Sequence, residues 1–146
     1  PDVLRFGLEK ITVPENDKSL YDRMGAEEII RPMCNELYDY HATDPISAPW
    51  FPSVSKWNQR TTNEVKENVF TFFSSGIGGP HEYKGQDMVA AHANMRDMKP
   101  ITEAAFHAIV YHVMTVMKKH NAGGEREMDE VWGILMSLKP AVMERK

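Results

Sequence analysis

The sequence has little cysteine and no long apolar stretch, and both absences narrow its class. Cys34 is the one cysteine among 146 residues, so no internal disulfide can form. The longest apolar runs are far too short to span a bilayer, and the first residues show no basic region followed by an apolar stretch. We therefore predict a cytoplasmic protein without a membrane segment or a signal peptide.

Basic residues are also fewer than acidic ones. The 17 lysines and arginines face 21 aspartates and glutamates, which gives a net charge of −4. This balance provides no general reason to bind nucleic acid or an anionic membrane, so neither partner is expected. The length suits one domain with a sizeable core. We predict an N-terminal extension over residues 1–18 and a single domain over 19–146, acting as a monomer or weak oligomer.

Most motifs of catalysis or metal binding are missing. The chain has no HExxH, no cysteine pair for zinc and no GxSxG. The GIGGP stretch at 76–80 lacks the lysine and spacing of a phosphate loop, and its glycines end a helix rather than begin one. His107 and His112 are five residues apart, so on a helix they point about 140° away from each other. Cys34 falls on an apolar helical side, which predicts an inert core thiol.

Helical periodicity is what the sequence does contain, and no run alternates convincingly at period two. Apolar residues recur at steps of three and four in several segments, bounded by glycine, proline and capping residues. The expected helices cover about 19–24, 26–43, 63–76, 86–95, 101–120 and 126–143. The fold class is therefore predicted to be all-α.

His92 is the residue that this pattern does not explain. It follows Met88 by four residues and Val89 by three, so helical spacing places it on an apolar face. A buried imidazole must satisfy two ring nitrogens. One interpretation is a core histidine bonded to a carbonyl. The other is a metal ligand, and haem is the metal group that needs only one protein imidazole together with a large apolar crevice.

Several segments, taken in order, resemble the truncated haemoglobins, nearest to the first group. They are LYDRMG at 20–25, LYDYHATDPISAPWF at 37–51, FTFFSSGIGGPHEYKGQDMVAAH at 70–92 and AAFHAIVYHV at 104–113. The resemblance covers roughly residues 19 to 139 and includes a phenylalanine thirteen residues after Tyr38 and a histidine nine residues after Tyr83. It implies a truncated-globin fold, a two-over-two helical sandwich around haem b (iron protoporphyrin IX).

The resemblance also implies roles for individual residues. His92 matches the proximal iron ligand, Tyr38 matches the distal tyrosine that donates to the bound ligand, and Phe51 matches the phenylalanine that stacks on the porphyrin. Tyr83 matches a residue near a propionate. The further expected haem contacts are Val65, Asn68, Val69, Phe72, Phe73, Met88, Ile101, Phe106, Ile109 and Leu135. Ordinary core packing is the other interpretation of the aromatic residues among them.

The sequence departs from the family pattern on the distal side. Val65, Asn68 and Val69 stand where the family often has polar residues, which speaks against a glutamine-assisted distal network. The segment after Phe51 is longer than usual, and so is the segment that follows His92.

The departure on the distal side bears on the sixth coordination position of the iron. Lys66 is about 100° from Val65 on a helix and should face away. His41 and His107 remain as candidate sixth ligands. We predict five-coordinate, high-spin ferrous haem that is open to oxygen.

The function implied by the resemblance is reversible binding of dioxygen and other diatomic ligands, such as nitric oxide or carbon monoxide. Two alternatives remain open. One is an enzyme that uses bound dioxygen to oxidise nitric oxide, or reacts with peroxide or nitrite, and needs an unidentified reductase. The other is a haem-based sensor or storage protein that uses the N-terminal segment as a contact element.

Overall fold

Helices account for all the regular secondary structure in the residues that the computed structural model describes, which are 18–51, 62–84 and 101–143. The elements are α1 (Leu20–Arg23), α2 (Ala26–Thr43), the 3₁₀ turn η2 (Ala48–Trp50), α3 (Thr62–Gly76), α5 (Glu103–Lys119), α6 (Glu125–Ser137) and α7 (Lys139–Met143). The all-α prediction is confirmed. The helix expected at 86–95 lies outside the described residues, as does nearly all of the expected N-terminal extension.

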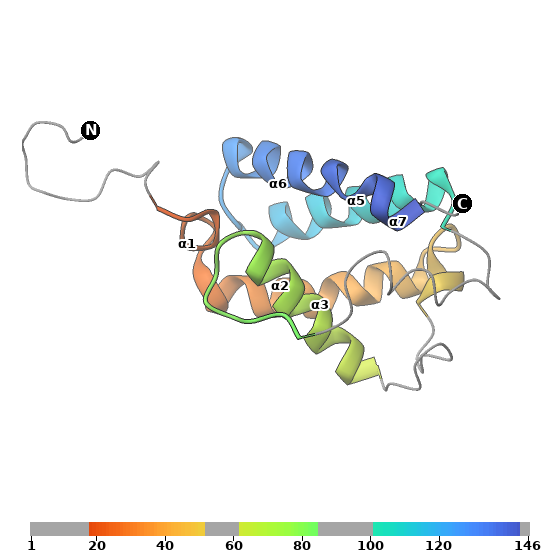
Figure 1. Ribbon diagram of the computed structural model, residues 1–146, viewed down its shortest axis with the longest axis horizontal. Helices are drawn as coiled ribbons and strands as arrows, with labels where there is room; N and C mark the ends of the chain where they lie inside the picture. The colour runs from red at the N-terminus through yellow and green to blue at the C-terminus, as the bar shows by residue number, and fades with distance from the viewer. Residues whose placement is uncertain (1–17, 52–61, 85–100, 144–146) are drawn as a thin grey trace, which may run out of the picture.

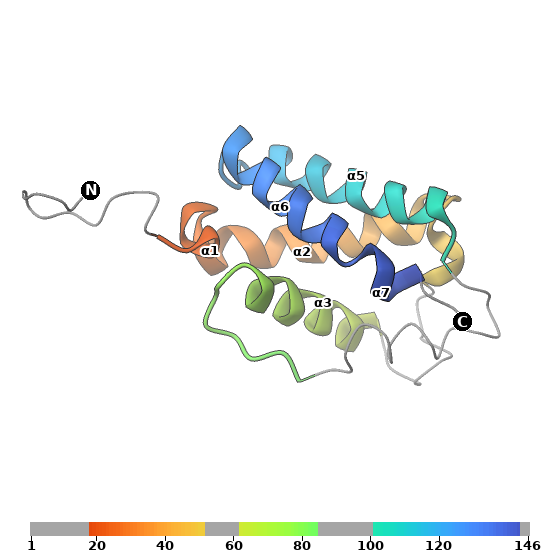
Figure 2. The ribbon, with the colours of Figure 1, turned by 45° about the horizontal axis from the view of Figure 1, so that its top comes forward.

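The four long helices of the described residues form two layers, one made of α2 and α3 and the other of α5 and α6 (Figures 1 and 2). α2 runs through the middle of the molecule, with α3 on one side and the α5–α6 pair on the other (Figures 1 and 2). α2 contacts both α3 and α5, and α5 contacts α6. This is the two-over-two arrangement that was expected. Within the described ranges, no helix has the length and apolarity needed to cross a membrane.

Two clusters of buried side chains form the core of the part of the chain that the structure describes. The first cluster lies among α1, α2, α3, α5 and α6, and consists of Leu20, Tyr21, Met24, Ile30, Met33, Cys34, Leu37, Phe70, Ile77, Val113, Val116, Met117, Ala122 and Val131. The second cluster is smaller and joins η2, the beginning of α5 and α7; it consists of Trp50, Ile101, Ala105, Phe106, Val110 and Val142. Helix α2 contributes buried residues to the first cluster and also contacts η2, which carries Trp50 of the second.

Among the helices that the structure describes, the C-terminal one was predicted with the wrong extent. A single helix over about 126–143 was expected, but α6 ends at Ser137 and α7 begins at Lys139. Pro140 is the physical reason, because it has no N–H to donate to the carbonyl of Met136 and its ring would clash with that carbonyl in a continuous helix. The chain turns at Leu138, whose N–H bonds to the carbonyl of Leu135 at 3.0 Å.

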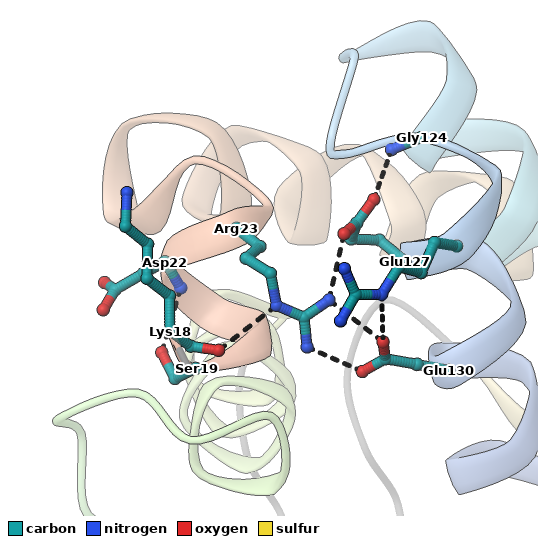
Figure 3. Close-up of polar contacts among 8 residues, drawn as sticks. Lys18, Ser19, Asp22, Arg23, Gly124, Glu127 and Glu130 are labelled. Atoms are coloured by element: carbon teal, nitrogen blue, oxygen red, sulfur yellow. Dashed lines mark hydrogen bonds and ion pairs between the residues drawn. The ribbon is translucent and has the colours of Figure 1, made fainter. Parts of the chain in front are cut away.

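An ion-pair network ties the beginning of the described chain to α6 (Figure 3). The guanidinium of Arg23 donates to Glu127 at 2.9 Å and to both oxygens of Glu130 at 2.8 and 3.0 Å. Glu127 also accepts from the N–H of Gly124 at 2.8 Å, at the beginning of α6. The hydrogen bond from Gly124 is the main cause of the lowered pKa of Glu127, and the bond from Arg23 is the main cause of the lowered pKa of Glu130. The network thus holds α1 against α6 through charged groups that are partly buried.

Candidate functional site

The C-terminal half of α2 carries a buried tyrosine next to an aromatic ring from the following segment. Tyr38 is 2% exposed, and its ring meets that of Phe51 edge to face, with centroids 5.9 Å apart. Phe51 follows η2 and packs against the second cluster. His41, one turn after Tyr38 on α2, lies against the same ring at 4.7 Å. The two residues expected on the distal side and on the porphyrin, Tyr38 and Phe51, are therefore in contact.

Helix α3 turns one face into the first cluster and a neighbouring face partly outward. Phe70 and Ser74 are fully buried, whereas the expected haem contacts on this helix are half-buried. Those contacts are Val65, Asn68, Val69, Phe72 and Phe73. The ring of Phe72 meets the ring of Tyr83 edge to face at 5.0 Å, so two more of the predicted residues are in contact.

The beginning of α5 supplies apolar surface beside Phe51. Ile101 and Phe106 are buried in the second cluster, against which Phe51 also packs. Ile109 is half-buried, and Leu135 of α6 packs against both clusters. The predicted residues at the beginning of α5 are therefore brought together with Phe51. Met88 and the candidate iron ligand His92 lie outside the described residues, so their roles stay predictions.

Two residues considered for the sixth coordination position have partners at the surface. His107 is exposed, with its Nε2 3.6 Å from Glu103 and 3.3 Å from Nζ of Lys139. Nζ of Lys66 lies 3.3 Å from a carboxylate oxygen of Asp39 and 5.8 Å from the centroid of the Tyr38 ring. These contacts hold both side chains against neighbouring helices.

The third candidate, His41, belongs to a buried polar chain that the sequence analysis did not find. Nδ1 of His41 lies 2.8 Å from Nδ1 of His112 on α5, and Nε2 of His112 lies 2.8 Å from a carboxylate oxygen of Asp44. The hydroxyl of Ser47 donates to the carbonyl of His41 at 2.7 Å. A usable signal was present, because His112 recurs at helical spacing with the buried residues of α5, seven after Ala105. This spacing does not indicate that the partner of His112 is His41 on α2.

Burial and hydrogen bonding shift the pKa values of the groups at this end of α2. Burial, reinforced by the neighbouring His112, lowers the pKa of His41 to about 3, so its imidazole is neutral. The N–H of Ile46, 2.9 Å away, and then the bond from His112 hold the pKa of Asp44 below its usual value. Elsewhere on α2, Cys34 is buried in the core as predicted, and its burial raises the pKa of the thiol to about 12.

The described residues fit a flat, largely apolar group such as haem. Three segments present aromatic and aliphatic side chains: the end of α2 with Phe51, the half-buried face of α3 with Tyr83, and the beginning of α5, which packs with Phe51. Polar groups are few among these side chains, and they include the hydroxyls of Tyr38 and Tyr83. Such lining is typical of cofactor sites, which are mostly apolar with a small number of placed polar groups.

Comparison with known proteins points to one family. A family model described as bacterial-like globin matches residues 19–144. The chain is 29% identical to the group 1 truncated hemoglobin LI410 of Chlamydomonas moewusii over 65% of this chain and 51% of that protein, so it spans about half the length of that relative. It is 30% identical to the group 1 truncated hemoglobin GlbN of Nostoc commune over 65% of this chain and 72% of that protein.

Solved structures give the same fold. The truncated hemoglobin of Tetrahymena pyriformis in its Fe(III) form is similar with a TM-score of 0.74 and 17% identity, over 88% of this chain and all (100%) of that one. Chlamydomonas reinhardtii THB1 is similar with a TM-score of 0.67 and 23% identity, over 89% of this chain and 98% of that one. At such identities these structures establish the fold alone.

Proposed function

Because the chain belongs to the bacterial-like globin family, among the truncated haemoglobins, we propose that it binds dioxygen reversibly at a haem b held by His92, with Tyr38 as hydrogen-bond donor to the bound ligand. Family membership itself implies haem-based binding of diatomic gases. When bound, haem would supply an iron that can take up a diatomic ligand, with His92 as the residue expected to hold it. The residues of this chain then decide how the group is held and how long a ligand stays.

The observation that supports this proposal best is the contact between Tyr38 and Phe51. Two residues thirteen positions apart, each expected to face the cofactor, lie edge to face at 5.9 Å. Tyr38 is buried, and water therefore competes little for its hydroxyl. Phe51 would then stack on the porphyrin, with Ile101 and Phe106 behind it in the second cluster.

A tyrosine hydroxyl at this place would favour a ligand that carries negative charge. Bound dioxygen carries partial negative charge, and a hydrogen bond to a charged group contributes about 1.5–3 kcal/mol. Carbon monoxide carries less charge on its outer atom and should gain less from the same donor. The role proposed for Tyr38 is therefore selective retention of dioxygen.

Replacing Tyr38 tests this role. Tyr38→Phe should raise the dioxygen dissociation rate roughly tenfold or more, since losing about 1.4 kcal/mol gives that factor. The carbon monoxide dissociation rate should change less. Stopped-flow measurement of both rates is the assay, and Tyr111→Phe is the matched control because Tyr111 is 70% exposed on α5. Equal changes for both gases would contradict a specific hydrogen bond.

The optical spectrum of the purified protein tests the cofactor and the coordination of its iron. Extraction into alkaline pyridine should give the spectrum of haem b. The ferrous protein without gas should show one broad visible band, because we expect no protein side chain in the sixth position. Two sharp low-spin bands would instead indicate an internal ligand, and single replacements of His41 and His107 would then identify it.

A further inference from the structure

We propose that Asp44, His112 and His41 form a hydrogen-bond relay in which protonation of His112 decides whether Nε2 of His41 donates or accepts a hydrogen bond. The relay makes His41 a positioning residue for the ligand site. Its effect on ligand binding rests on the proposed function, whereas the relay itself does not. The three groups come from α2, α5 and the turn that follows α2.

The geometry supports a chain of three groups rather than a metal site. The two contacts, from Asp44 to His112 and from His112 to His41, are both 2.8 Å and use opposite nitrogens of the His112 ring. The histidines are 4% and 5% exposed, whereas Asp44 is partly exposed. Among the described residues, no three His, Cys, Asp or Glu side chains converge so as to hold a metal ion. The chain therefore leads from the surface into the buried end of α2.

The ionised carboxylate of Asp44 sets the direction of the hydrogen bonds when His112 is neutral. A carboxylate only accepts, so Nε2 of His112 must carry its proton and donate to Asp44. Nδ1 of a neutral His112 is then an acceptor, and Nδ1 of His41 must donate to it. Since His41 is also neutral, its Nε2 is left with a lone pair that can only accept.

Protonation of His112 reverses the inner hydrogen bond. Both nitrogens of an imidazolium are donors, so Nδ1 of His112 now donates to Nδ1 of His41. His41 must shift to the other neutral tautomer, in which Nε2 carries the proton and can donate. His41 changes its hydrogen-bonding character in this step without becoming charged, and the new positive charge on His112 faces the carboxylate of Asp44 at 2.8 Å.

Few ionisable groups surround the relay. Besides Asp44, the rings that face His112 are those of Tyr40 on α2, at 5.9 Å, and of the neighbouring Tyr111 on α5, at 6.5 Å. Within the described ranges, no lysine or arginine forms an ion pair or hydrogen bond with either histidine. Among the described residues, the one full charge in contact with the relay is therefore the carboxylate of Asp44.

The inner end of the relay lies beside the ligand site. The ring of His41 is 4.7 Å from that of Phe51, which in turn contacts Tyr38. No described residue forms a hydrogen bond to Nε2 of His41. A buried ring nitrogen without a partner is costly, so Nε2 calls for a polar partner such as a water molecule or a ligand. A change from acceptor to donor at this nitrogen would alter which partner is held there.

Nitrogen NMR of the haem-loaded, carbon monoxide-bound protein tests the relay directly. Nitrogen-15 shifts of the imidazoles, recorded across about pH 5 to 8, the range in which histidines change charge, distinguish protonated from bare ring nitrogens. As pH falls, we expect His112 to become doubly protonated while the proton of His41 moves from Nδ1 to Nε2. A His41 whose tautomer does not change, or which becomes doubly protonated itself, would overturn the proposal.

Two variants separate the relay from a merely structural role. Asp44→Asn should move the pH midpoint of the His41 tautomer change, because the carboxylate that accepts from Nε2 of His112 at 2.8 Å is lost. His107→Gln is the matched control, since it removes an exposed histidine from the same helix and should leave the change in place. An unshifted midpoint in Asp44→Asn would contradict the role of the carboxylate.

The functional readout is the pH dependence of the dioxygen dissociation rate. His112→Gln should abolish the part of this dependence that follows the tautomer change. If Tyr38→Phe leaves the dissociation rate unchanged while the NMR result holds, the donor role of Tyr38 fails and the relay stands. If the tautomer never changes while Tyr38→Phe acts as expected, the relay fails and the proposed function stands.

Discussion

The two ends of α2 are built on different principles. Toward its N-terminus, α2 buries Ile30, Met33 and Cys34 in the first cluster, and the charged groups nearby form ion pairs at the surface, such as Arg31 with Glu27. Toward its C-terminus, the same helix buries a tyrosine and a histidine beside a much smaller apolar cluster. One helix thus joins a region held by apolar packing to a region in which polar groups are buried.

The difference indicates how stability and ligand binding are divided between the two regions. Burying apolar side chains is strongly favourable, whereas burying polar ones is at best weakly so, and they are retained where they have a use. The buried His41 and His112 contribute a hydrogen-bonded chain rather than a large packing energy. We therefore expect mutations in the first cluster to affect mainly the free energy of unfolding, and mutations near Tyr38 to affect mainly ligand binding.

The largest expected effect is loss of haem binding near the C-terminal end of α2, while the helices and the first cluster remain folded. His92→Ala should abolish stable haem binding or leave a site that added imidazole restores, because one imidazole is expected to hold the iron. The Soret band reports the haem, and far-ultraviolet circular dichroism reports the helices. A mutant that keeps a normal spectrum without imidazole would refute the assignment of His92.

Two phenylalanines on α3 allow a direct test of the difference between the first cluster and the predicted haem site, since they lie two residues apart on different faces of the helix. Phe70 is fully buried in the first cluster, so Phe70→Ala should lower the free energy of unfolding by about 3–5 kcal/mol. Phe72 is half-buried against Tyr83. Phe72→Ala should lower the free energy of unfolding by only about 1–2 kcal/mol but should increase the rate of haem loss. Urea denaturation and haem transfer to apomyoglobin measure the two quantities. Equal changes in stability would show that the faces of α3 are not divided in this way.

The expected effect that is smallest near neutral pH concerns the pH dependence of the free energy of unfolding at the polar end of α2. The folded protein holds His41 with a pKa of about 3, so the unfolded chain alone binds a proton there as pH falls from the usual value of about 6.5. The contribution of His41 to the free energy of unfolding is thus fully present above about pH 6.5. It is lost as pH falls toward 3, with a slope of at most ~1.4 kcal/mol per pH unit.

His41→Asn tests this slope because an amide can replace Nδ1 in the hydrogen bond but does not titrate. The difference in unfolding free energy between wild type and variant, measured by denaturant titration at several pH values, should shrink or change sign as pH falls. A pH-independent difference would mean that His41 titrates equally in both states.

The sequence predicted the helices well and the long-range contacts poorly. Local signals sufficed for α2 and α5: acidic residues in the first turns, the Asp44-Pro45 end and the glycines after α5. The break at Leu138 was missed because the apolar repeat runs on from Val131 through Leu138, and Pro140 was outweighed by that pattern.

Prediction of the site depended on the kind of contact. The family resemblance implies that Tyr38 and Phe51 each face the haem, and the structure places their rings in contact with each other. The pairing of His41 with His112 joins residues 71 positions apart, and no local periodicity specifies which helix a buried polar group will face. The role of His92 rests on its sequence pattern and on the family, since it lies outside the described residues.

The network around Arg23 has a consequence for the order of folding events. Its bonds join residues 104 and 107 positions apart, so they close nearly the largest loop that the described chain can make. Contacts of such long range are costly in chain entropy and tend to form after local helices and nearer contacts have been assembled. Arg23 should therefore act late, slowing the unfolding of the assembled protein while contributing little to the rate at which it assembles.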